Sequence, residues 1–472
     1  MIGDLEVGPS LTMTRIAKCQ FKNYLNNDFY EITKLRHEEV DDDSINFDSS
    51  IEICGNQIQL FEKPKDLIFI NHIDNPRHLG IRPDEVVVGN VMTRGHDVIE
   101  RMLSEQWTMV SGPQWLSEHL LKSRWVLAVS GTHGKTTTSS MLAWILEYAG
   151  LDPGFLIGGI PHNFSVSARM GSKPFFVIEA DEYDTAFFDK RSKFVHYQPR
   201  SLVINNLEFD HADIFRDLQD IQRQFHHLIK ILPGMGKLIF NGDDENIKQV
   251  ISQGVWSENE SFGLGNECDW QLNKCHDKKK PYQFSMHDGK KHEGYLSLLG
   301  EHNALNALAA IAAARHAGVT VEQSLKALAE FQGVKRRLEN KGTFAGVTIF
   351  DDFAHHPTEI QCTLQSFKQQ YSNHRMVVVF EPRSNTMQMG VHADQLQIAL
   401  SSADELCIYD GGELNWSIQE RLANLHSNIF TDIDRLAEYL IAMLQPNDNV
   451  IILSNGAFGG LCSKLIDGLS QQ

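Results

Sequence analysis

The residues most able to do chemistry lie in a short turn, GTHGKT, from Gly131 to Thr136. The turn follows an apolar run at Val126–Val129 and precedes a stretch with helical spacing. Glycines let backbone N–H groups approach phosphate oxygens, and a helix N-terminus adds partial positive charge. Lys135 could then reach the β- and γ-phosphates of a nucleotide, while the Thr136 hydroxyl could bind Mg²⁺. The turn therefore predicts a phosphate-binding loop.

The spacing of this turn differs from the usual G-x-x-x-x-G-K-[ST] pattern, because Val129 stands where the first glycine would be. A loop that only resembles a phosphate loop is the alternative interpretation. The strand before the turn and the helix after it favour nucleotide binding.

Acidic and histidine side chains follow two further predicted strands. Glu179 ends the apolar run of "FFVIEADEYD", and His211 lies in "NNLEFDHADIF" beyond the next run. Ligands bind at the carboxyl ends of the strands in an open parallel sheet, so these segments should meet the phosphate loop in one crevice. Mg²⁺ prefers oxygen ligands, which makes Glu179 its natural partner, and a neutral His211 could complete a second metal site. A lone histidine is more often a capping or core residue, and its place in this group favours the ligand.

Length and charge restrict the class of protein. The 472 residues predict two to four domains, and 42% hydrophobic with 22% charged residues is typical of a soluble globular protein. The net charge of −18 disfavours nucleic acid and anionic membranes as partners, so local cationic groups must hold any anionic substrate. No apolar run approaches the ~20 residues that span a bilayer, and the N-terminus lacks the features of a signal peptide. We expect a cytoplasmic protein.

The seven cysteines are scattered and never form a CxxC pair. This pattern argues against a disulfide framework and against a zinc site. The closest pair, Cys268 and Cys275, has His276 nearby, but it lies in a polar stretch that resembles a loop.

The elements that must position these residues alternate between strand and helix. Predicted strands occur at Val126–Val129, Phe175–Ile178, Leu202–Ile204, Leu238–Phe240, Val347–Phe350, Val377–Phe380, Leu406–Tyr409 and Val450–Leu453. Such alternation predicts α/β domains with parallel sheets covered on both faces. The Lys-rich segment 273–294 predicts an exposed hairpin or loop insertion, and the Ala-rich segment 303–316 predicts a helix ended by glycine.

The first eighty residues differ from the rest of the chain. They contain an acidic cluster at Glu38, Glu39 and Asp41–Asp43, which predicts a solvated loop. They contain no strand–glycine–helix turn, and Gly55 is isolated. Clearer signals begin with a buried-type strand at Glu85–Val88 and a helical "DVIERML" segment.

Taken in order, the segments "GTHGKTTT", "EADEYD", "NNLEFDHADIF", "EHNALNALAA", "GVKRRLE" and "DDFAHHPTE" resemble the Mur ligase family, whose ATP-dependent enzymes build the peptidoglycan stem peptide. The resemblance runs from about Arg82 to the C-terminus. It implies three domains: an atypical N-terminal α/β domain (1–123) for the UDP-sugar, a central P-loop ATPase-type parallel-sheet domain (124–334) for ATP, and a Rossmann-like C-terminal domain (335–472) for the peptide.

The implied reaction joins an amine substrate to UDP-N-acetylmuramate through an acyl phosphate, with ATP and Mg²⁺. The segments "FFDKRSKFVHYQPRS", "FEPRSNTMQMG" and "SNGAFGG" are similar to the branch that recycles the intact tripeptide L-Ala-γ-D-Glu-meso-diaminopimelate. The alternatives are an alanine-adding ligase, a P-loop ATPase or kinase without an amide product, and a paralogue that only binds. The partners expected are these small molecules, with no nucleic acid and no membrane.

The resemblance also implies the residues of the site. The catalytic set is Lys135, Glu179, His211 and Arg337, and the metal ligands are Thr136, Glu179 and His211. The nucleotide-binding set is Gly131, Thr132, His133, Gly134, Lys135, Thr136, His302, Asn303, Asn306 and Asp352. The substrate-binding set is His355, His356, Arg383, Ser384 and Asn385. Asn303 and Asn306 could instead be helix-end polar contacts, and Arg336 or Arg337 ordinary surface charge.

Overall fold

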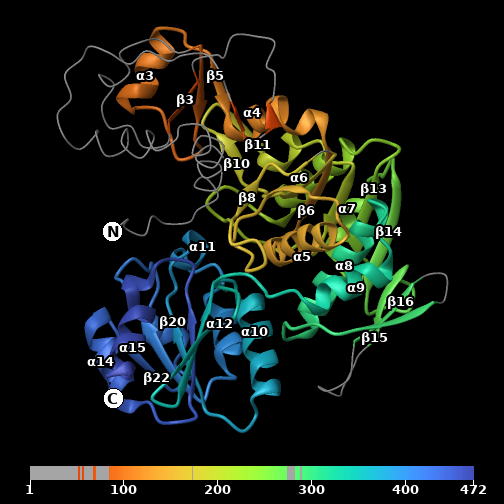
Figure 1. The fold of residues 1–472 in the computed structure, drawn as a ribbon. Coiled ribbons are helices and arrows are strands. Elements are labelled where there is room, and N and C mark those ends of the chain that lie inside the picture. The colour runs from red at the N-terminus through yellow and green to blue at the C-terminus, as the bar shows by residue number, and fades with distance from the viewer. Residues whose placement is uncertain are drawn as a thin grey trace.

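The computed structural model describes residues 52–53, 56–57, 67–70 and 84–471, except 173, 274–281 and 287–289. The acidic cluster at 38–43, Gly55 and the Cys275–His276 pair lie outside this part of the chain. The described elements form three domains, which succeed one another along the molecule from the N-terminal domain through the central domain to the C-terminal domain (Figure 1). None of the described helices combines the length and the apolarity that crossing a bilayer requires.

The N-terminal domain is a small parallel sheet with one packed helix. Its elements are the hairpin β1 (Glu52–Ile53) and β2 (Asn56–Gln57), then β3 (Leu67–Ile70), β4 (Glu85–Val88), α3 (Asp97–Ser104), β5 (Met109–Ser111), α4 (Gly112–His119) and the 3₁₀ turn η2 (Leu121–Ser123). β4 pairs in parallel with both β3 and β5. The buried face of α3, with Val98, Ile99 and Met102, packs on Val86 and Val88. The strand and helix expected from residue 85 onward are confirmed.

The central domain is built on one large sheet. Its strands are β6 (Trp125–Ser130), β7 (Gly154–Leu156), β8 (Ala168–Arg169), β9 (Phe175–Glu179), β12 (Ser201–Ile204), β13 (Lys237–Asn241), β14 (Glu258–Gly263), β15 (Trp270–Asn273), β16 (Tyr282–Met286) and β17 (Lys291–Gly294). Its helices are α5 (Lys135–Tyr148), α6 (Leu218–Lys230), α7 (Glu245–Ile251), α8 (Glu301–His316) and α9 (Val321–Ala329). A separate ribbon joins β10 (Asp184–Ala186) to β11 (Asp189–Ser192), which leads into the 3₁₀ turn η3 (Lys193–His196).

The order of strands in this sheet is β17-β16-β15-β14-β13-β12-β6-β9-β7-β8. The strands from β15 to β7 run parallel. The expected hairpin at 273–294 is confirmed, because β16 pairs antiparallel with both β15 and β17. One core lies under α5, α8 and α9, and a second lies under α6 and α7, so both faces of the sheet are covered as expected. Neighbouring side chains of β6 alternate between the two cores: Leu127 faces the first and Val126 the second.

Strand register brings the ends of three strands to one edge. Val129 pairs with Glu179 across β6 and β9, and Ser130 pairs with Ile204 across β6 and β12. The segments that follow these strands therefore leave the sheet side by side. The expected proximity of these segments is therefore confirmed.

The C-terminal domain has the Rossmann-like alternation expected. Its elements are β18 (Glu339–Phe344), β19 (Val347–Asp352), α10 (Pro357–Gln370), β20 (Met376–Phe380), α11 (Asn385–Gln388), α12 (Ala393–Leu400), β21 (Glu405–Tyr409), α13 (Ile418–Arg421), β22 (Ser427–Phe430), α14 (Ile433–Met443), β23 (Asn449–Leu453), the 3₁₀ turn η4 (Phe458–Gly460) and α15 (Leu461–Ser470). The strand order is β18-β19-β23-β20-β21-β22, parallel except for β18. Helices α10 and α12 cover one face of the sheet and α14 and α15 the other.

The connection between the central and C-terminal domains is held by backbone contacts. Val334 forms a β-bridge with Pro161, and the neighbouring Lys335 N–H donates to the carbonyl of Ile160 at 3.0 Å. Arg336 and Leu338 then take left-handed backbone angles, with φ of 58° and 49°. The chain is thus fixed to the central domain up to Lys335 and turns sharply directly after it.

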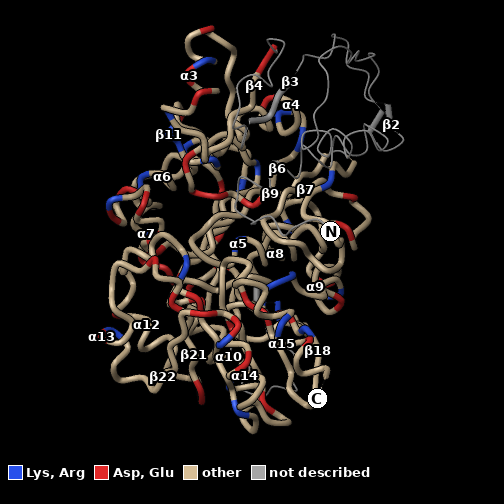
Figure 2. Tube along the Cα trace, turned by 90° about the vertical axis from the view of Figure 1, so that its left-hand side faces the viewer, with Lys and Arg blue, Asp and Glu red and all other residues tan. Residues whose placement is uncertain are grey.

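Charge is distributed over the whole molecule. Acidic and basic residues both occur in each of the three domains (Figure 2).

The cysteines Cys268, Cys362, Cys407 and Cys462 are free thiols.

Candidate functional site

The phosphate loop has the conformation that the sequence predicted, between β6 and α5. Gly131 and Gly134 have φ values of 133° and 76°, which L side chains rarely adopt. A Cβ atom at Gly134 would lie 2.6 Å from Oδ1 of Asn306, and one at Gly131 would lie 3.1 Å from the backbone of Asn206. Both positions therefore require glycine for conformation and for space.

Lys135 begins α5 and is paired inside the site. Its Nζ donates to the carbonyl of Gly131 at 2.6 Å and to Oε2 of Glu182 at 2.9 Å. Burial alone would lower the pKa of Lys135, but the charges of Glu182 and Asp181 outweigh it and hold the pKa above its ordinary value. The loop therefore carries a fixed buried cation at a helix N-terminus, as triphosphate binding requires.

Thr136 and Glu179 meet directly. The Thr136 hydroxyl donates to Oε1 of Glu179 at 2.9 Å, and the Gly158 N–H donates to Oε2 at 2.6 Å. Burial raises the pKa of Glu179, against the effects of Gly158 and Lys135. A hydroxyl and a carboxylate side by side next to the lysine form the kind of oxygen ligand set that Mg²⁺ takes.

His211 reaches the same group through a residue that the sequence interpretation did not select. Its Nε2 lies 3.2 Å from Oε1 of Glu182, whose other oxygen faces Lys135, and its ring packs on Tyr183 at 4.2 Å between centroids. Burial lowers the pKa of His211, but Glu182 more than offsets this effect and the pKa is raised. Ligand atoms of Asp181, Glu182 and His211 lie within 4.8 Å of one another. Glu182 is therefore the carboxylate that joins the lysine to the histidine.

The expected asparagines of α8 support the phosphate loop. Asn306 is buried against Gly134, accepts a hydrogen bond from Nδ2 of Asn205 at 3.4 Å and donates to Oδ1 of Asn303 at 3.3 Å. His302 starts the same helix, and burial lowers its pKa to about 4, so its ring is neutral at pH 7. The first turns of α8 thus lie behind the loop.

The two arginines after the linker have different surroundings. The Arg337 guanidinium lies over the Phe353 ring, 5.2 Å from its centroid, with Nη1 3.7 Å from Oε1 of Glu359. The Arg336 guanidinium lies over the same ring, also 5.2 Å from its centroid, but it donates to the carbonyls of Ser454 and Gly456 at 2.6 and 2.7 Å and pairs with Asp351 at 3.3 Å. Arg336 therefore stabilises a loop of the C-terminal domain. Arg337 is the arginine that lies beside Glu359.

Asp352 ends β19 and accepts two backbone hydrogen bonds. The N–H groups of Leu338 and Ala354 donate to its two oxygens at 2.6 and 2.7 Å. Burial raises the pKa of this carboxyl to about 6, although Arg337 and these bonds oppose the shift. Asp352 therefore fixes the turn that carries Arg337.

The remaining predicted residues of the C-terminal domain face the central domain or cap helices. Nδ1 of His356 caps α10 by accepting the Thr358 N–H at 3.3 Å, and His355 Nδ1 lies 3.2 Å from the Phe353 carbonyl. Ser384 caps α11. Asn385 donates to Asp213 of the central domain at 3.0 Å. Arg383 packs closely on Gly456: a Cβ atom added at Gly456 would lie 2.2 Å from Nη1 of Arg383.

His133 connects the phosphate loop to the C-terminal domain. Its Nε2 lies 3.7 Å from Glu208, and its Nδ1 lies 3.5 Å from Glu359 of α10. Burial lowers the pKa of His133, but the two carboxylates outweigh it and raise the pKa to about 9. Thr358 of α10 also donates to Glu208 at 2.7 Å. The site therefore lies where two domains meet, with groups from both.

Comparisons with known proteins identify the family of two domains of the chain. Residues 129–314 match the Mur ligase middle domain, and residues 336–456 match the Mur ligase, glutamate ligase domain. The chain is 49% identical over 394 residues to the UDP-N-acetylmuramate–L-alanyl-gamma-D-glutamyl-meso-2,6-diaminoheptandioate ligase of Escherichia coli, which covers 83% of this chain and 86% of that protein. It is 32% identical over 391 residues to the UDP-N-acetylmuramate–L-alanine ligase of Desulfitobacterium hafniense, covering 79% and 84%.

A solved structure extends the similarity to the fold. The murein peptide ligase of Psychrobacter arcticus superposes with a TM-score of 0.66 at 40% identity, covering 85% of this chain and 89% of that one. The phosphate loop, Glu179 and His211 lie inside the segment that matches the middle domain. On the identity and coverage of these relatives, the chain belongs to the Mur ligase family.

Proposed function

We propose that this protein is an ATP-dependent ligase that joins L-Ala-γ-D-Glu-meso-diaminopimelate to UDP-N-acetylmuramate during murein recycling. The observation that carries this assignment is the identity of 49% to a tripeptide ligase, against 32% to an alanine ligase over nearly the same length of chain. The family membership and the phosphate loop support the use of ATP.

The chemistry requires an activated carboxylate. The muramoyl carboxylate attacks the γ-phosphorus of ATP, an acyl phosphate forms and ADP leaves. The peptide α-amine then attacks the acyl carbon and loses a proton, and the tetrahedral intermediate expels phosphate. Lys135 would stabilise the charge on the transferred phosphoryl group, and the position of the site between two domains would keep water from the acyl phosphate.

We also propose that Mg²⁺ binds at Thr136 and Glu179, and that a second ion uses His211 with Glu182. The direct contact between the Thr136 hydroxyl and the Glu179 carboxylate supports the first site. The cluster of Asp181, Glu182 and His211 supports the second. A bound Mg²⁺ would supply positive charge to the phosphates.

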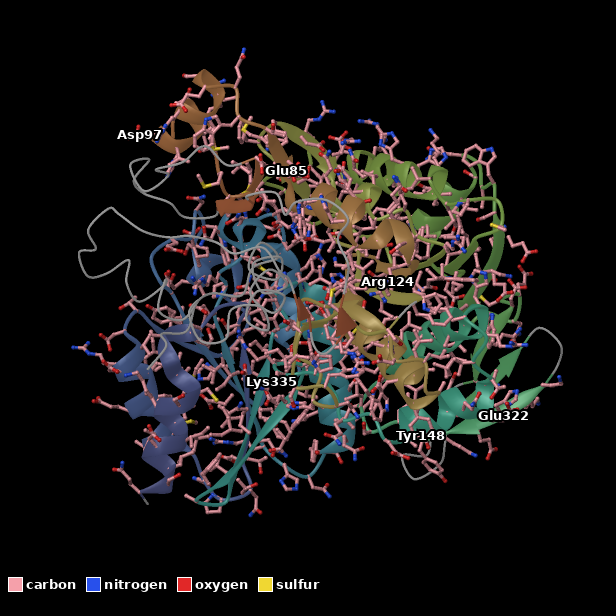
Figure 3. All side chains as sticks on the ribbon, turned by 45° about the horizontal axis from the view of Figure 1, so that its top comes forward. Glu85, Asp97, Arg124, Tyr148, Glu322 and Lys335 are labelled. Atoms are coloured by element: carbon pink, nitrogen blue, oxygen red, sulfur yellow. The ribbon has the colours of Figure 1, made fainter. Side chains whose placement is uncertain are left out.

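Further roles remain part of the proposal. His302, Asn303, Asn306 and Asp352 would line the nucleoside end of the ATP site, and Arg337 would meet the γ-phosphate. His355, His356, Arg383, Ser384 and Asn385 would contact the peptide. We also propose domain boundaries at residues 123/124 and 334/335; Arg124 and Lys335, the first residues after these boundaries, are labelled in Figure 3.

The test is an assay with ATP, UDP-N-acetylmuramate and either the tripeptide or L-alanine, read by phosphate release and product mass. We expect a ligated product with the tripeptide and none with alanine. A product with alanine alone would identify an alanine ligase, and phosphate release without any amine would identify an ATPase. If UDP-N-acetylmuramate produced neither heat nor a thermal shift, the ligase assignment would be wrong.

A further inference from the structure

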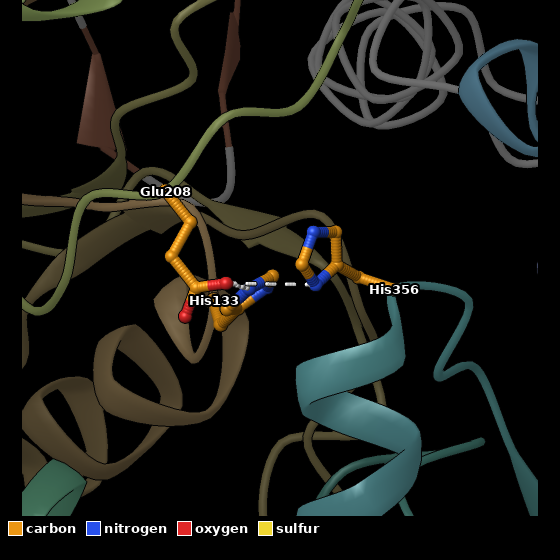
Figure 4. A group of neighbouring side chains, drawn as sticks. All are labelled: His133, Glu208 and His356. Atoms are coloured by element: carbon orange, nitrogen blue, oxygen red, sulfur yellow. Dashed lines mark ion pairs between the residues drawn. The ribbon is translucent and has the colours of Figure 1, made fainter. Parts of the chain in front are cut away.

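A second group of possible metal ligands lies apart from the proposed magnesium sites. His133 comes from the phosphate loop, Glu208 from the segment after β12, and His356 from the N-terminus of α10. These three side chains converge from two domains (Figure 4). One ligand atom from each lies within 4.8 Å of the others.

The distances in this cluster suit one metal ion. Oε2 of Glu208 lies 3.7 Å from Nε2 of His133 and 3.8 Å from Nδ1 of His356. Ligand atoms on a tetrahedral zinc ion, with bonds of about 2.0–2.1 Å, stand roughly 3.4 Å apart. The two imidazoles each offer a nitrogen within 4.8 Å of the other, so a bound ion would draw the three side chains closer together.

The surrounding groups already orient two of the ligands. Nδ1 of His133, the nitrogen that faces away from the cluster, lies 3.5 Å from the Glu359 carboxylate. The Thr358 hydroxyl holds Oε2 of Glu208 at 2.7 Å. Metal-bound histidines usually donate their other N–H to a carboxylate, and metal-bound carboxylates are themselves hydrogen-bonded.

His356 faces the cluster with Nδ1, which lies 3.8 Å from Oε2 of Glu208. Its side chain is only 3% exposed, and its Nδ1 accepts the Thr358 N–H at 3.3 Å, so the proton of the neutral ring lies on Nε2. Burial and the nearby His133 lower the pKa of His356 to about 4, which keeps the ring neutral at pH 7. A metal at Nδ1 would replace this one long capping hydrogen bond.

We propose that His133, Glu208 and His356 form a binding site for a divalent transition metal of the Zn²⁺ class, which bridges the phosphate loop and the C-terminal domain. Two imidazoles and one carboxylate favour Zn²⁺ or Co²⁺, whereas Mg²⁺ prefers oxygen ligands alone. The site lies outside the magnesium ligands Thr136, Glu179 and His211. An ion there would join the two domains and oppose their separation.

The test uses the full chain, freed of metal by a chelator and dialysed into buffer at pH 8 with excess Mg²⁺ to fill the oxygen-rich sites. Co²⁺ is titrated and followed by its visible absorption, and Zn²⁺ is titrated by calorimetry. We expect one equivalent bound with a four-coordinate Co²⁺ spectrum. Glu208→Gln and His356→Gln should each weaken binding at least tenfold, because each removes one ligand.

Two control variants assign the site. His211→Gln alters the other metal cluster, and His392→Gln removes a ring that packs on His356 at 4.5 Å without supplying a ligand. Both should bind Zn²⁺ within about threefold of the wild-type affinity. Equal binding by wild type, E208Q and H356Q would overturn the proposal, as would loss of binding in H211Q alone. Thermal unfolding of each metal-free variant establishes that it is folded. The ligase assay with Mg²⁺ alone tests the proposed function separately.

Discussion

Lys135 and Glu182 form an ion pair in which Glu182 is only 2% exposed and Lys135 12% exposed. Removing one partner of a buried pair leaves an uncompensated charge and costs about 3–5 kcal/mol of stability. The pair thus links the stability of the phosphate loop to the group that would bind phosphate. Loss of activity and loss of folding must therefore be separated in any test of Lys135.

We expect Lys135→Met to reduce turnover by about 10²–10³-fold, because a preorganised charge in the transition state is lost. The single variant should also unfold more easily. The double variant K135M/E182Q should recover much of the stability without recovering activity, as measured by thermal unfolding and phosphate release. Near-normal turnover in either variant would contradict the phosphate-loop assignment.

His211→Ala should raise the Mg²⁺ concentration needed for half-maximal activity, because one ligand of the second proposed ion is lost. A tenfold or larger shift is expected, since even residues behind a metal ligand cost 10–100-fold. His374→Ala is a suitable control because its ring lies in the C-terminal domain, beside Tyr371 and with Nδ1 2.9 Å from the carbonyl of Asn447. An unchanged magnesium titration would show that His211 is no ligand.

His302 predicts a pH dependence of stability. Its folded pKa of about 4 lies below the unfolded value near 6.5, so the unfolded chain takes up a proton first as the pH falls. Stability is then lost between pH 6.5 and pH 4, by at most about 2 kcal/mol at pH 5. Denaturant unfolding at pH 7 and pH 5 should show a smaller loss in His302→Gln than in wild type. The same loss in both proteins would exclude His302 as its source.

Residue types and spacing were sufficient to predict Lys135, Thr136, Glu179 and His211 as one group. They could not distinguish Glu182 from the other carboxylates of the same acidic run, because the bend after β9 decides which side chain faces Lys135. Spacing also left Arg336 and Arg337 nearly equivalent. Their partners distinguish them: Arg336 donates to the carbonyls of Ser454 and Gly456, whereas Arg337 lies beside Glu359, and these contacts join segments far apart in the chain.

At the scale of elements, the turn into α5 depends on Gly134. Gly134→Ala should cost about 1–2 kcal/mol for the left-handed backbone and should also force Asn306 away from the loop. Gly150→Ala is a matched control, since Gly150 has the same φ of 76° and nothing within 4 Å of its Cβ position. G134A should lose more stability than G150A, because it adds the clash with Asn306, and only G134A should lose ATP affinity, measured by calorimetry. Equal affinities would mean that the fit of Asn306 to the loop is unimportant.

The apolar strands of both parallel sheets were predictable because they are buried on both faces and read as continuous runs. Strands β14 and β22 were not predicted. Their sequences, ENESFG and SNIF, are largely polar, and each owes its place to pairing with a neighbouring strand. Propensity alone gives no sign of such pairing.

At the scale of the whole molecule, α10 docks on the central domain through Thr358. Thr358→Val removes its hydrogen bond to Glu208, worth about 1–2 kcal/mol for a charged acceptor, and should lower kcat/KM about tenfold by disfavouring closure. Thr343→Val, on the exposed β18–β19 hairpin, is the control. Small-angle scattering should show a more open T358V molecule, and an unchanged profile with normal kcat/KM would contradict the role of this contact.

The backbone contacts around residues 334–338 have a mechanical consequence. The Lys335 N–H bonds to Ile160 of the central domain, and the Arg336 carbonyl accepts the Phe353 N–H of the C-terminal domain. A rotation between the two domains would therefore take place at the peptide units between these two hydrogen bonds. The C-terminal domain would then rotate as one unit about an axis close to Arg337. Arg337 directly follows these peptide units in the chain, so a rotation about them would displace its backbone less than it displaces the rest of the C-terminal domain.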